Sequence, residues 1–477
     1  MEGEDGGCVE NLKDFIIETP VEGTLLTKKG DGWMKLNTAC PSLERLALDG
    51  GTVQCVACDK PARTVEFRSG TLYENTGSSY AIHVPEGGSG TWSLANRSTY
   101  TNKITGEGTL TIYCAVEHGN GWFATRTPVA VNLAQFTGTI NATADMADTY
   151  PRFTLNTSSG MPDGTLNIAG GVTVQNTGRT FRIGKLAGKG ALGGYASFAN
   201  DGATGVNTWQ VGCDDDFAWA GTVTANSKFE KVGSGKMTVS GVWDNTGEVA
   251  VKEGTLCLND RSAENAMLGS GELSVEDGAV LCGLGKLGNA SVTVERGGRL
   301  YSGTREGASS GALDFSGKRL TVSAGGEVMF NVASKVRCTT LEGISSFSLR
   351  GTLKVSVRER LELEAGDEFQ LWTANRTVLS SACTLDLDSP GEGLEWDTSA
   401  LEDGVLKVKT ATGITGVVSG EPVDCVVYTL DGARAGYFTC MPSEVREYME
   451  ENGFKSGMYM VKMTQGQRTV SRKVTVD

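Results

Sequence analysis

The chain has 477 residues, of which 65 are glycine and only 10 are proline. Glycine at about twice its usual frequency without a Gly-X-Y period excludes collagen, and a hydrophobic content of 39% excludes a disordered low-complexity chain. The 57 acidic and 43 basic residues give a net charge of −14, which argues against nucleic acid and anionic membrane surfaces as partners.

The sequence shows neither a transmembrane segment nor a secretory signal. No apolar run approaches the roughly 18 residues that a membrane-spanning helix needs. The first residues, Met-Glu-Gly-Glu-Asp-Gly-Gly, lack both the basic and the apolar region of a signal peptide. We expect that a signal has been removed, because the C-terminal part described below indicates export.

Short strands with alternating apolar and polar residues dominate the chain, and no convincing amphipathic helix precedes residue 440. Each run is rich in Val, Ile, Leu and Thr and ends at a glycine-containing turn, as expected for a strand with one buried face. Clear examples are residues 108–113, 164–168, 236–240, 272–275, 290–294 and 351–357.

Internal repetition decides how these strands are arranged. Residues 26–36 match residues 229–239 in a Lys-x-Gly-x-Gly turn and the strand after it. In both copies a Gly-Thr-apolar return strand follows at the same distance, beginning at Gly51 and at Gly254. A strand this short cannot bury its apolar face alone, whereas stacked units can.

We therefore predict an all-β protein: a right-handed parallel β-helix, or β-solenoid, followed by a small C-terminal β-sandwich-like domain. Coils of about 20 to 25 residues imply on the order of 17 coils in residues 25–410. Residues 1–24 form an N-terminal lead-in or cap, and residues 411–477 form the C-terminal domain. Linked β-sandwiches are the alternative, but the expected linkers are missing.

Residues 229–258 resemble the passenger-associated transport repeat of autotransporter-type surface proteins, with its Lys-x-Gly-x-Gly-x-Leu-x-Leu turn, variable loop and Gly-Thr-Leu strand. Residues 268–300 resemble the segment that usually follows, and residues 365–371 and 393–404 resemble the end of such solenoids. The resemblance covers most of residues 180–410 and is looser over residues 25–180. It implies a solenoid displayed at the cell surface.

The C-terminal residues resemble the sorting domain of type IX secretion cargo. The similarity lies in residues 427–434, 456–462 and 472–476, with their Asp-Gly and Ser-Gly turns, while residues 443–452 depart from the family as a short helical insertion. The resemblance implies a secreted or cell-surface protein of a Gram-negative outer membrane, exported by machinery that recognises this domain.

Few residues suggest catalysis. His83 and His118 are the only histidines, and neither has a second ligand at metal-binding spacing, so we nominate no catalytic residue and no organic cofactor. The 12 cysteines are sparse and several lie in strands, so we expect buried free thiols for most of them, with Cys55 and Cys58 as the first candidates for an exception.

The acidic run at residues 214–216 is the one candidate metal site. In an extended stretch Asp214 and Asp216 lie on one face, and their oxygens suit Ca²⁺. A solvated turn is the alternative, because the repeat has a variable polar loop at this place.

Aromatic residues suggest a glycan-binding role, since an indole can stack on the apolar face of a sugar ring. Core or turn positions are the alternative for each of them. The candidates are Trp92, Trp209, Trp219 and Trp243, with Tyr100 and Trp122 considered beside them.

These observations favour a non-enzymatic, adhesin-like rod that contacts glycans or host or neighbouring surface proteins. A polysaccharide lyase or glycosidase on a β-helix is one alternative, and a glycan-binding module that serves a separate enzyme is another. The excess glycine is assigned to the corners at which coils turn and stack.

Overall fold

The fold is described from a computed structural model. It covers residues 6–55, 58–74, 77–95, 100–115, 128–129, 131–144, 152–155, 159–176, 179–194, 206–224, 227–259, 267–411, 421–465 and 468–476. Contacts divide the chain into two compact units. The first comprises Met1–Arg358, Gln370–Leu387 and Glu402–Gly404, and the second comprises Glu359–Phe369, Asp388–Leu401 and Val405–Asp477.

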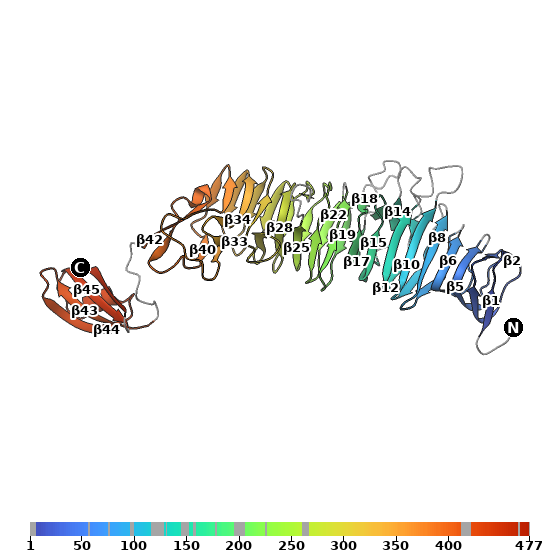
Figure 1. Cartoon of the computed structure of the whole chain (residues 1–477), viewed down its shortest axis with the longest axis horizontal. Coiled ribbons are helices and arrows are strands. Elements are labelled where there is room, and N and C mark those ends of the chain that lie inside the picture. The colour runs from blue at the N-terminus through green and yellow to red at the C-terminus, as the bar shows by residue number, and fades with distance from the viewer. Residues whose placement is uncertain are drawn as a thin grey trace. The chain divides into compact units, whose positions relative to one another are not determined.

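Stacked parallel strands build the first unit, which confirms the predicted solenoid (Figure 1). In the part of the chain that the structure describes, 22 strands form one parallel sheet and 12 more form a second. A smaller parallel sheet consists of β11 (Pro128–Val129), β14 (Arg152–Leu155), β16 (Thr173–Asn176), β18 (Ala191–Gly194) and β21 (Thr222–Val223). Pairing already begins ahead of residue 25, since β1 and β2 pair with β3 and β4. The strands of the first few coils are β1 (Gly7–Glu10), β2 (Phe15–Ile17), β3 (Gly23–Lys29), β4 (Trp33–Leu36), β5 (Leu43–Cys55), β6 (Thr64–Glu74), β7 (Ala81–Val84), β8 (Ser89–Ala95), β9 (Lys103–Gly106) and β10 (Thr109–Ala115).

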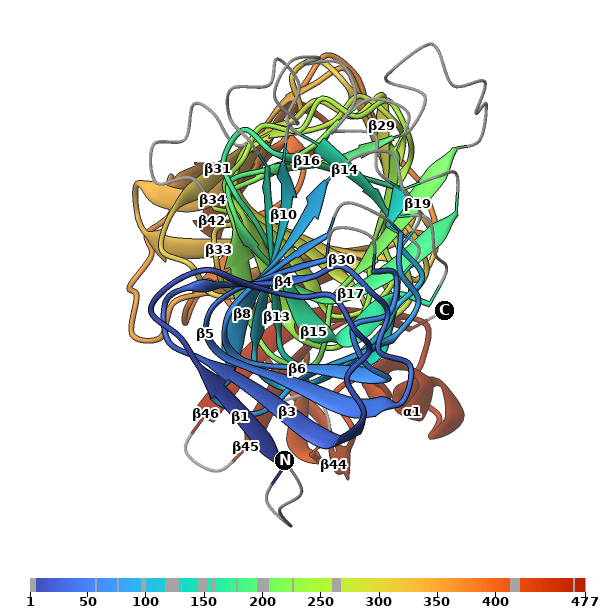
Figure 2. The same ribbon diagram turned by 90° about the vertical axis from the view of Figure 1, so that its right-hand side faces the viewer.

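Side chains of one kind line up from coil to coil, because each strand pairs in register with the next. Leu72, Trp92 and Ile112 are consecutive partners and all are buried, so they form one column of the core. In Figure 2 the view is along the stack, with the coils one behind another. The remaining strands of the 22-stranded sheet are β12 (Asn132–Phe136), β13 (Thr139–Ala144), β15 (Met161–Ile168), β17 (Thr180–Gly188), β19 (Asn207–Val211), β22 (Ser227–Lys231), β24 (Val249–Val251), β27 (Leu273–Val275), β29 (Ser291–Val294), β32 (Arg319–Val322), β35 (Ser346–Leu349) and β39 (Thr377–Leu379).

The second sheet departs from the repeat at one place. β33 pairs with β34 in an antiparallel hairpin, although its pairings with β30 and β36 are parallel. The strands of this sheet are β20 (Phe217–Trp219), β23 (Lys236–Val239), β25 (Thr255–Asn259), β26 (Met267–Leu268), β28 (Val280–Leu287), β30 (Arg299–Ser302), β31 (Gly311–Asp314), β33 (Glu327–Ser334), β34 (Arg337–Ile344), β36 (Thr352–Val357), β38 (Trp372–Ala374) and β40 (Thr384–Leu387).

The Lys-x-Gly-x-Gly repeat has a shared physical basis in its two copies. Lys231 is fully buried, and its ammonium donates to the carbonyl oxygens of Val232 and Gly233 in its own turn and of Glu253 in the next coil. Lys28 is also buried and donates in the same way to Lys29, Gly30 and Gly50, at 2.8, 2.6 and 3.4 Å. The lysine thus satisfies carbonyl groups at the coil corner that would otherwise lack partners.

The return-strand glycine of the repeat is required by close approach. Gly254 has a φ of +64°, and a Cβ there would lie 2.5 Å from the carbonyl oxygen of Gly233. Gly51, its counterpart in the first copy, has a φ of +61° and would meet the oxygen of Gly30. Adjacent corners therefore stack without room for a side chain.

The second unit contains the expected small C-terminal β domain. Its sheet has the order β44-β43-β45-β46 and is antiparallel throughout. Helix α1 contributes Val445 and Met449 to the core of this sheet, so the layer packed on it here is a helix. The bounds are β41 (Leu394–Asp397), β42 (Val405–Thr410), β43 (Val423–Thr429), β44 (Arg434–Cys440), α1 (Val445–Glu451), β45 (Gly457–Gln465) and β46 (Arg468–Val476).

Helix α1 coincides with the helical insertion predicted at residues 443–452. Among the residues that the structure describes, no helix has the length and apolar character needed to cross a membrane.

Candidate binding surfaces

The four candidate tryptophans lie inside the coils. Trp92, Trp209, Trp219 and Trp243 are each at most 1% exposed, so none presents a ring face to solvent. Their positions follow the strand alternation: Trp92, for example, shares the phase of the buried Leu94. Tyr100 is also buried and packs edge-on against Trp92, while Trp122 lies outside the described residues.

Trp33 is the tryptophan that alternation places outside. It precedes the buried Met34 in β4, and 38% of its surface is exposed. The sequence contained the signal, because Met34 and Leu36 fix the inward phase of the strand and leave Trp33 and Lys35 facing outward.

The acidic run ties neighbouring coils together. Asp214 accepts hydrogen bonds from the hydroxyl and the backbone N–H of Ser234, which lower the pKa of its carboxyl, and Asp216 accepts from the N–H of Lys236 at 2.7 Å. The described residues contain no group of three or more His, Cys, Asp and Glu side chains that could hold a metal ion. Calcium at Asp214 and Asp216 stays a prediction.

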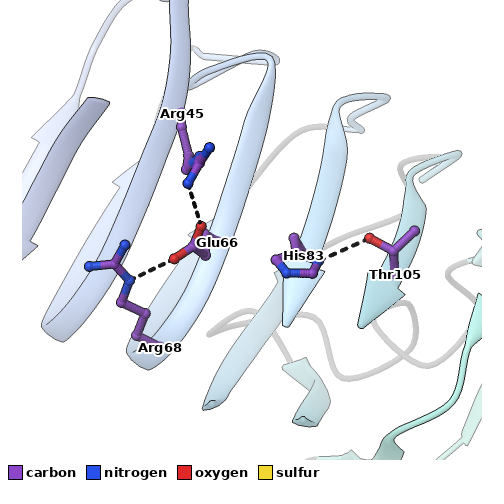
Figure 3. A network of polar contacts seen from close by, with 5 residues as sticks. All are labelled: Arg45, Glu66, Arg68, His83 and Thr105. Atoms are coloured by element: carbon purple, nitrogen blue, oxygen red, sulfur yellow. Dashed lines mark hydrogen bonds and ion pairs between the residues drawn. The ribbon is translucent and has the colours of Figure 1, made fainter. Parts of the chain in front are cut away.

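Two groups of polar contacts lie on neighbouring strands, one around Glu66 and one at His83 (Figure 3). Glu66 is engaged on both oxygens, by Arg45 at 3.2 Å and by Arg68 at 2.6 Å. His83 is the register partner of Glu66, and its Nδ1 lies 3.2 Å from the hydroxyl of Thr105. The Glu66 contacts join β5 to β6, and the His83 contact joins β7 to β9. His118 lies outside the described residues.

The cysteines whose thiols the structure describes are all free, and most of them are buried. Cys55 and Cys58 are both fully buried and lie close enough for their thiols to interact. The thiol of Cys114 is outside the described part of the chain.

One buried carboxyl lies inside the coils, near these thiols. Glu74 accepts a hydrogen bond from the indole N–H of Trp92 at 2.6 Å and another from the hydroxyl of Ser78 at 3.0 Å, both on Oε2. Burial raises the pKa of Glu74 to about 7, against the opposing effect of its hydrogen bonds. The group is enclosed in the core and is not placed to meet a ligand.

A continuous uncharged surface crosses the first half of the stack. Register pairing aligns one outward-facing, partly exposed residue from each of six coils, which we call the polar ladder. Trp33 pairs with the first member and extends the column with an aromatic ring. The members of the polar ladder are Thr52, Thr71, Thr91, Thr111, Asn141 and Asn167.

Hydrogen bonds order the far end of the polar ladder. Asn167 donates to the amide oxygen of Asn141 at 2.8 Å, and Asn141 donates to the hydroxyl of Thr111 at 3.4 Å. A second uncharged column runs beside it and includes two tyrosines. Its members are Gln54, Tyr73, Ser93, Tyr113 and Thr143.

The polar ladder could donate and accept hydrogen bonds at regular intervals, since successive strands lie about 4.8 Å apart. Hydroxyl and amide groups pair with neutral hydroxyl groups without the cost of removing a charge from water.

Comparison with known proteins does not assign the chain to a family, because no protein-family model matches the chain and no curated protein is significantly similar to it.

Proposed function

We propose that the chain is an exported, adhesin-like surface protein, non-enzymatic, whose solenoid binds neutral glycans along the polar ladder. The observation that carries this proposal is the in-register run of uncharged hydroxyl and amide side chains over six coils, which continues at one end into the exposed ring of Trp33.

Regular spacing favours an extended ligand. A polymer whose sugar units repeat along its length can offer each coil an equivalent hydroxyl group, so that many weak contacts add up. The uncharged composition of the column favours a neutral polysaccharide. The net charge of −14 on the whole chain supports the same choice, because it repels acidic polymers at long range.

Replacing two central threonines by valine tests the proposal. The Thr91→Val, Thr111→Val double variant removes two hydroxyl groups and keeps β-branched side chains of similar shape. Retention of the protein on insoluble neutral polysaccharides is expected to weaken about tenfold, at roughly 1 kcal/mol or less for each hydrogen bond.

A matched control is available elsewhere in the stack. Thr293 and Thr321 are register partners on β29 and β32 and are also partly exposed. The Thr293→Val, Thr321→Val variant is expected to bind like wild type. Equal retention of both double variants contradicts a role for the polar ladder.

Export is the second part of the proposal and rests on the resemblance of residues 427–476 to type IX sorting domains, with the outer membrane or the medium of a Gram-negative cell as the destination. The compact core of the sheet and α1 supports a separately recognised domain. In a host with that export machinery, a chain that lacks residues 421–477 is expected to stay inside the cell envelope. Unchanged surface display of the truncated chain would refute this part.

A further inference from the structure

A pocket of about 220 Å³ lies on the outer face of the second sheet, where the coil pattern is interrupted. Its floor comes from the parallel strands β30, β33 and β36, through residues that include Tyr301, Met329 and Ser356. Two departures from the coil pattern wall it: the loop between β30 and β31, and the hairpin of β33 and β34.

Hydrogen bonds hold these walls in place. The side-chain amide of Asn331 donates to the carbonyl oxygen of Ala308 in the loop at 2.7 Å, and the N–H of Asn331 donates to the hydroxyl of Thr339 in the hairpin at 2.9 Å. Ser302 donates to the carbonyl oxygen of Gly311, where the loop rejoins the sheet, at 2.8 Å. Ser302 and Thr339 are each only 2% exposed, so the pocket is lined by ordered polar groups.

The lining combines an apolar part with polar groups. Tyr301 and Met329, register partners on β30 and β33, supply the apolar part, whereas the ring of Phe330 packs against Trp372 in the core. The exposed carboxylate of Glu306 lies among the lining residues. Among the described residues Glu306 forms one long ion pair, with Arg299 at 3.7 Å, and its side chain is 59% exposed, so its oxygens can accept hydrogen bonds from a ligand. The volume is below the roughly 300 to 1,000 Å³ of pockets for drug-sized ligands, which indicates a ligand of about one ring.

We propose that this pocket binds one neutral hexose ring, such as the terminal residue of a glycan. The C–H face of a sugar suits the apolar surface formed by the register partners Tyr301 and Met329, and its hydroxyl groups suit a carboxylate acceptor such as Glu306. The same carboxylate disfavours acidic sugars, because two like charges repel. The ligand class rests on the proposed glycan-binding function, whereas the residues are separate from the polar ladder.

The test titrates the full chain with D-glucose, D-galactose and D-glucuronate, observed by ligand NMR or calorimetry. We expect one of the two neutral hexoses to bind with a dissociation constant of about 1 mM and glucuronate to bind more weakly. Glu306→Gln is expected to weaken hexose binding about tenfold, as for the loss of one charge-assisted hydrogen bond. Ser356→Trp fills the pocket and is expected to abolish binding.

Two controls keep the outcomes apart. Asp277→Asn changes an exposed acidic residue outside the pocket lining and is expected to leave hexose binding unchanged. The Thr91→Val, Thr111→Val variant should also bind the hexose normally, even where it loses the polysaccharide, so that failure of the ladder and failure of the pocket are distinguishable. The inference is overturned if wild type shows no saturable hexose binding, or if Glu306→Gln binds hexose as well as wild type does. Because Glu306→Gln alters an exposed side chain, it still provides the test if Ser356→Trp fails to fold.

Discussion

Ionisation of Glu74 should make the stability of the solenoid depend on pH. Its carboxyl is fully buried, and burial raises its pKa from 4.5 to about 7 in the folded chain. The folded state therefore binds this proton more tightly than the unfolded state does. The stabilisation is fully present below about pH 4.5 and is lost as the pH rises through about 7.

The size of the effect follows from the shift. A change of about 2.5 pKa units corresponds to about 3 kcal/mol at 1.36 kcal/mol for each unit. Glu74→Gln replaces the carboxyl by a neutral amide, whose oxygen can still accept from Trp92 and Ser78. The Tyr80 hydroxyl lies beside the carboxyl of Glu74 inside the core, so the new amide N–H group has an acceptor there.

Urea unfolding followed by tryptophan fluorescence at pH 5, 6.5 and 8 measures this. Relative to wild type, Glu74→Gln should gain up to about 3 kcal/mol in free energy of unfolding between pH 5 and pH 8. Glu272→Gln, at an exposed position, should run parallel to wild type at every pH. A constant difference between Glu74→Gln and wild type would refute the reasoning.

Three further predictions concern the coil corners and the exposed tryptophan. Gly254→Ala should cost more than about 2 kcal/mol of stability in thermal unfolding. Gly278 has a similar positive φ but open space where a Cβ would lie, so Gly278→Ala should cost about 1 kcal/mol, and equal costs would contradict the close-approach argument. Lys231→Met should destabilise the chain by about 2 to 4 kcal/mol in urea, because three corner carbonyl groups lose their donor, and a neutral result would remove the proposed role of the lysine. Trp33→Ala should weaken binding to neutral polysaccharide about three- to tenfold in affinity electrophoresis, whereas Trp33→Phe should bind nearly as well as wild type. Unchanged mobility of the alanine variant would exclude stacking of a sugar ring at this end of the polar ladder.

The solenoid could be predicted from the sequence because its signals are local. The strand alternation, the Lys-x-Gly-x-Gly turn and the glycine that follows it each act within one or two coils, and Gly254 shows why that glycine is needed. The burial of Lys231 could not be predicted from the sequence, since a lysine in a turn ordinarily points to water. Its role depends on carbonyl groups of the neighbouring coil.

The polar ladder could not be predicted because it depends on register across coils of unequal length. Thr91 pairs with Thr111, but the next partner is Asn141, after a longer coil. A single sequence does not show which loop lengthens the coil. The burial of the tryptophans can be predicted from the sequence, because alternation with Leu94 and Val211 already places Trp92 and Trp209 on the inward face of their strands.

A glycan array probed with the full chain and with the Thr91→Val, Thr111→Val variant tests the central claim most directly. Wild type is expected to bind extended neutral glycans, and the variant is expected to lose that signal while it keeps the wild-type unfolding profile. Absence of any signal from wild type, binding confined to acidic glycans, or an identical pattern for the two proteins would contradict the assignment of the polar ladder as a binding surface.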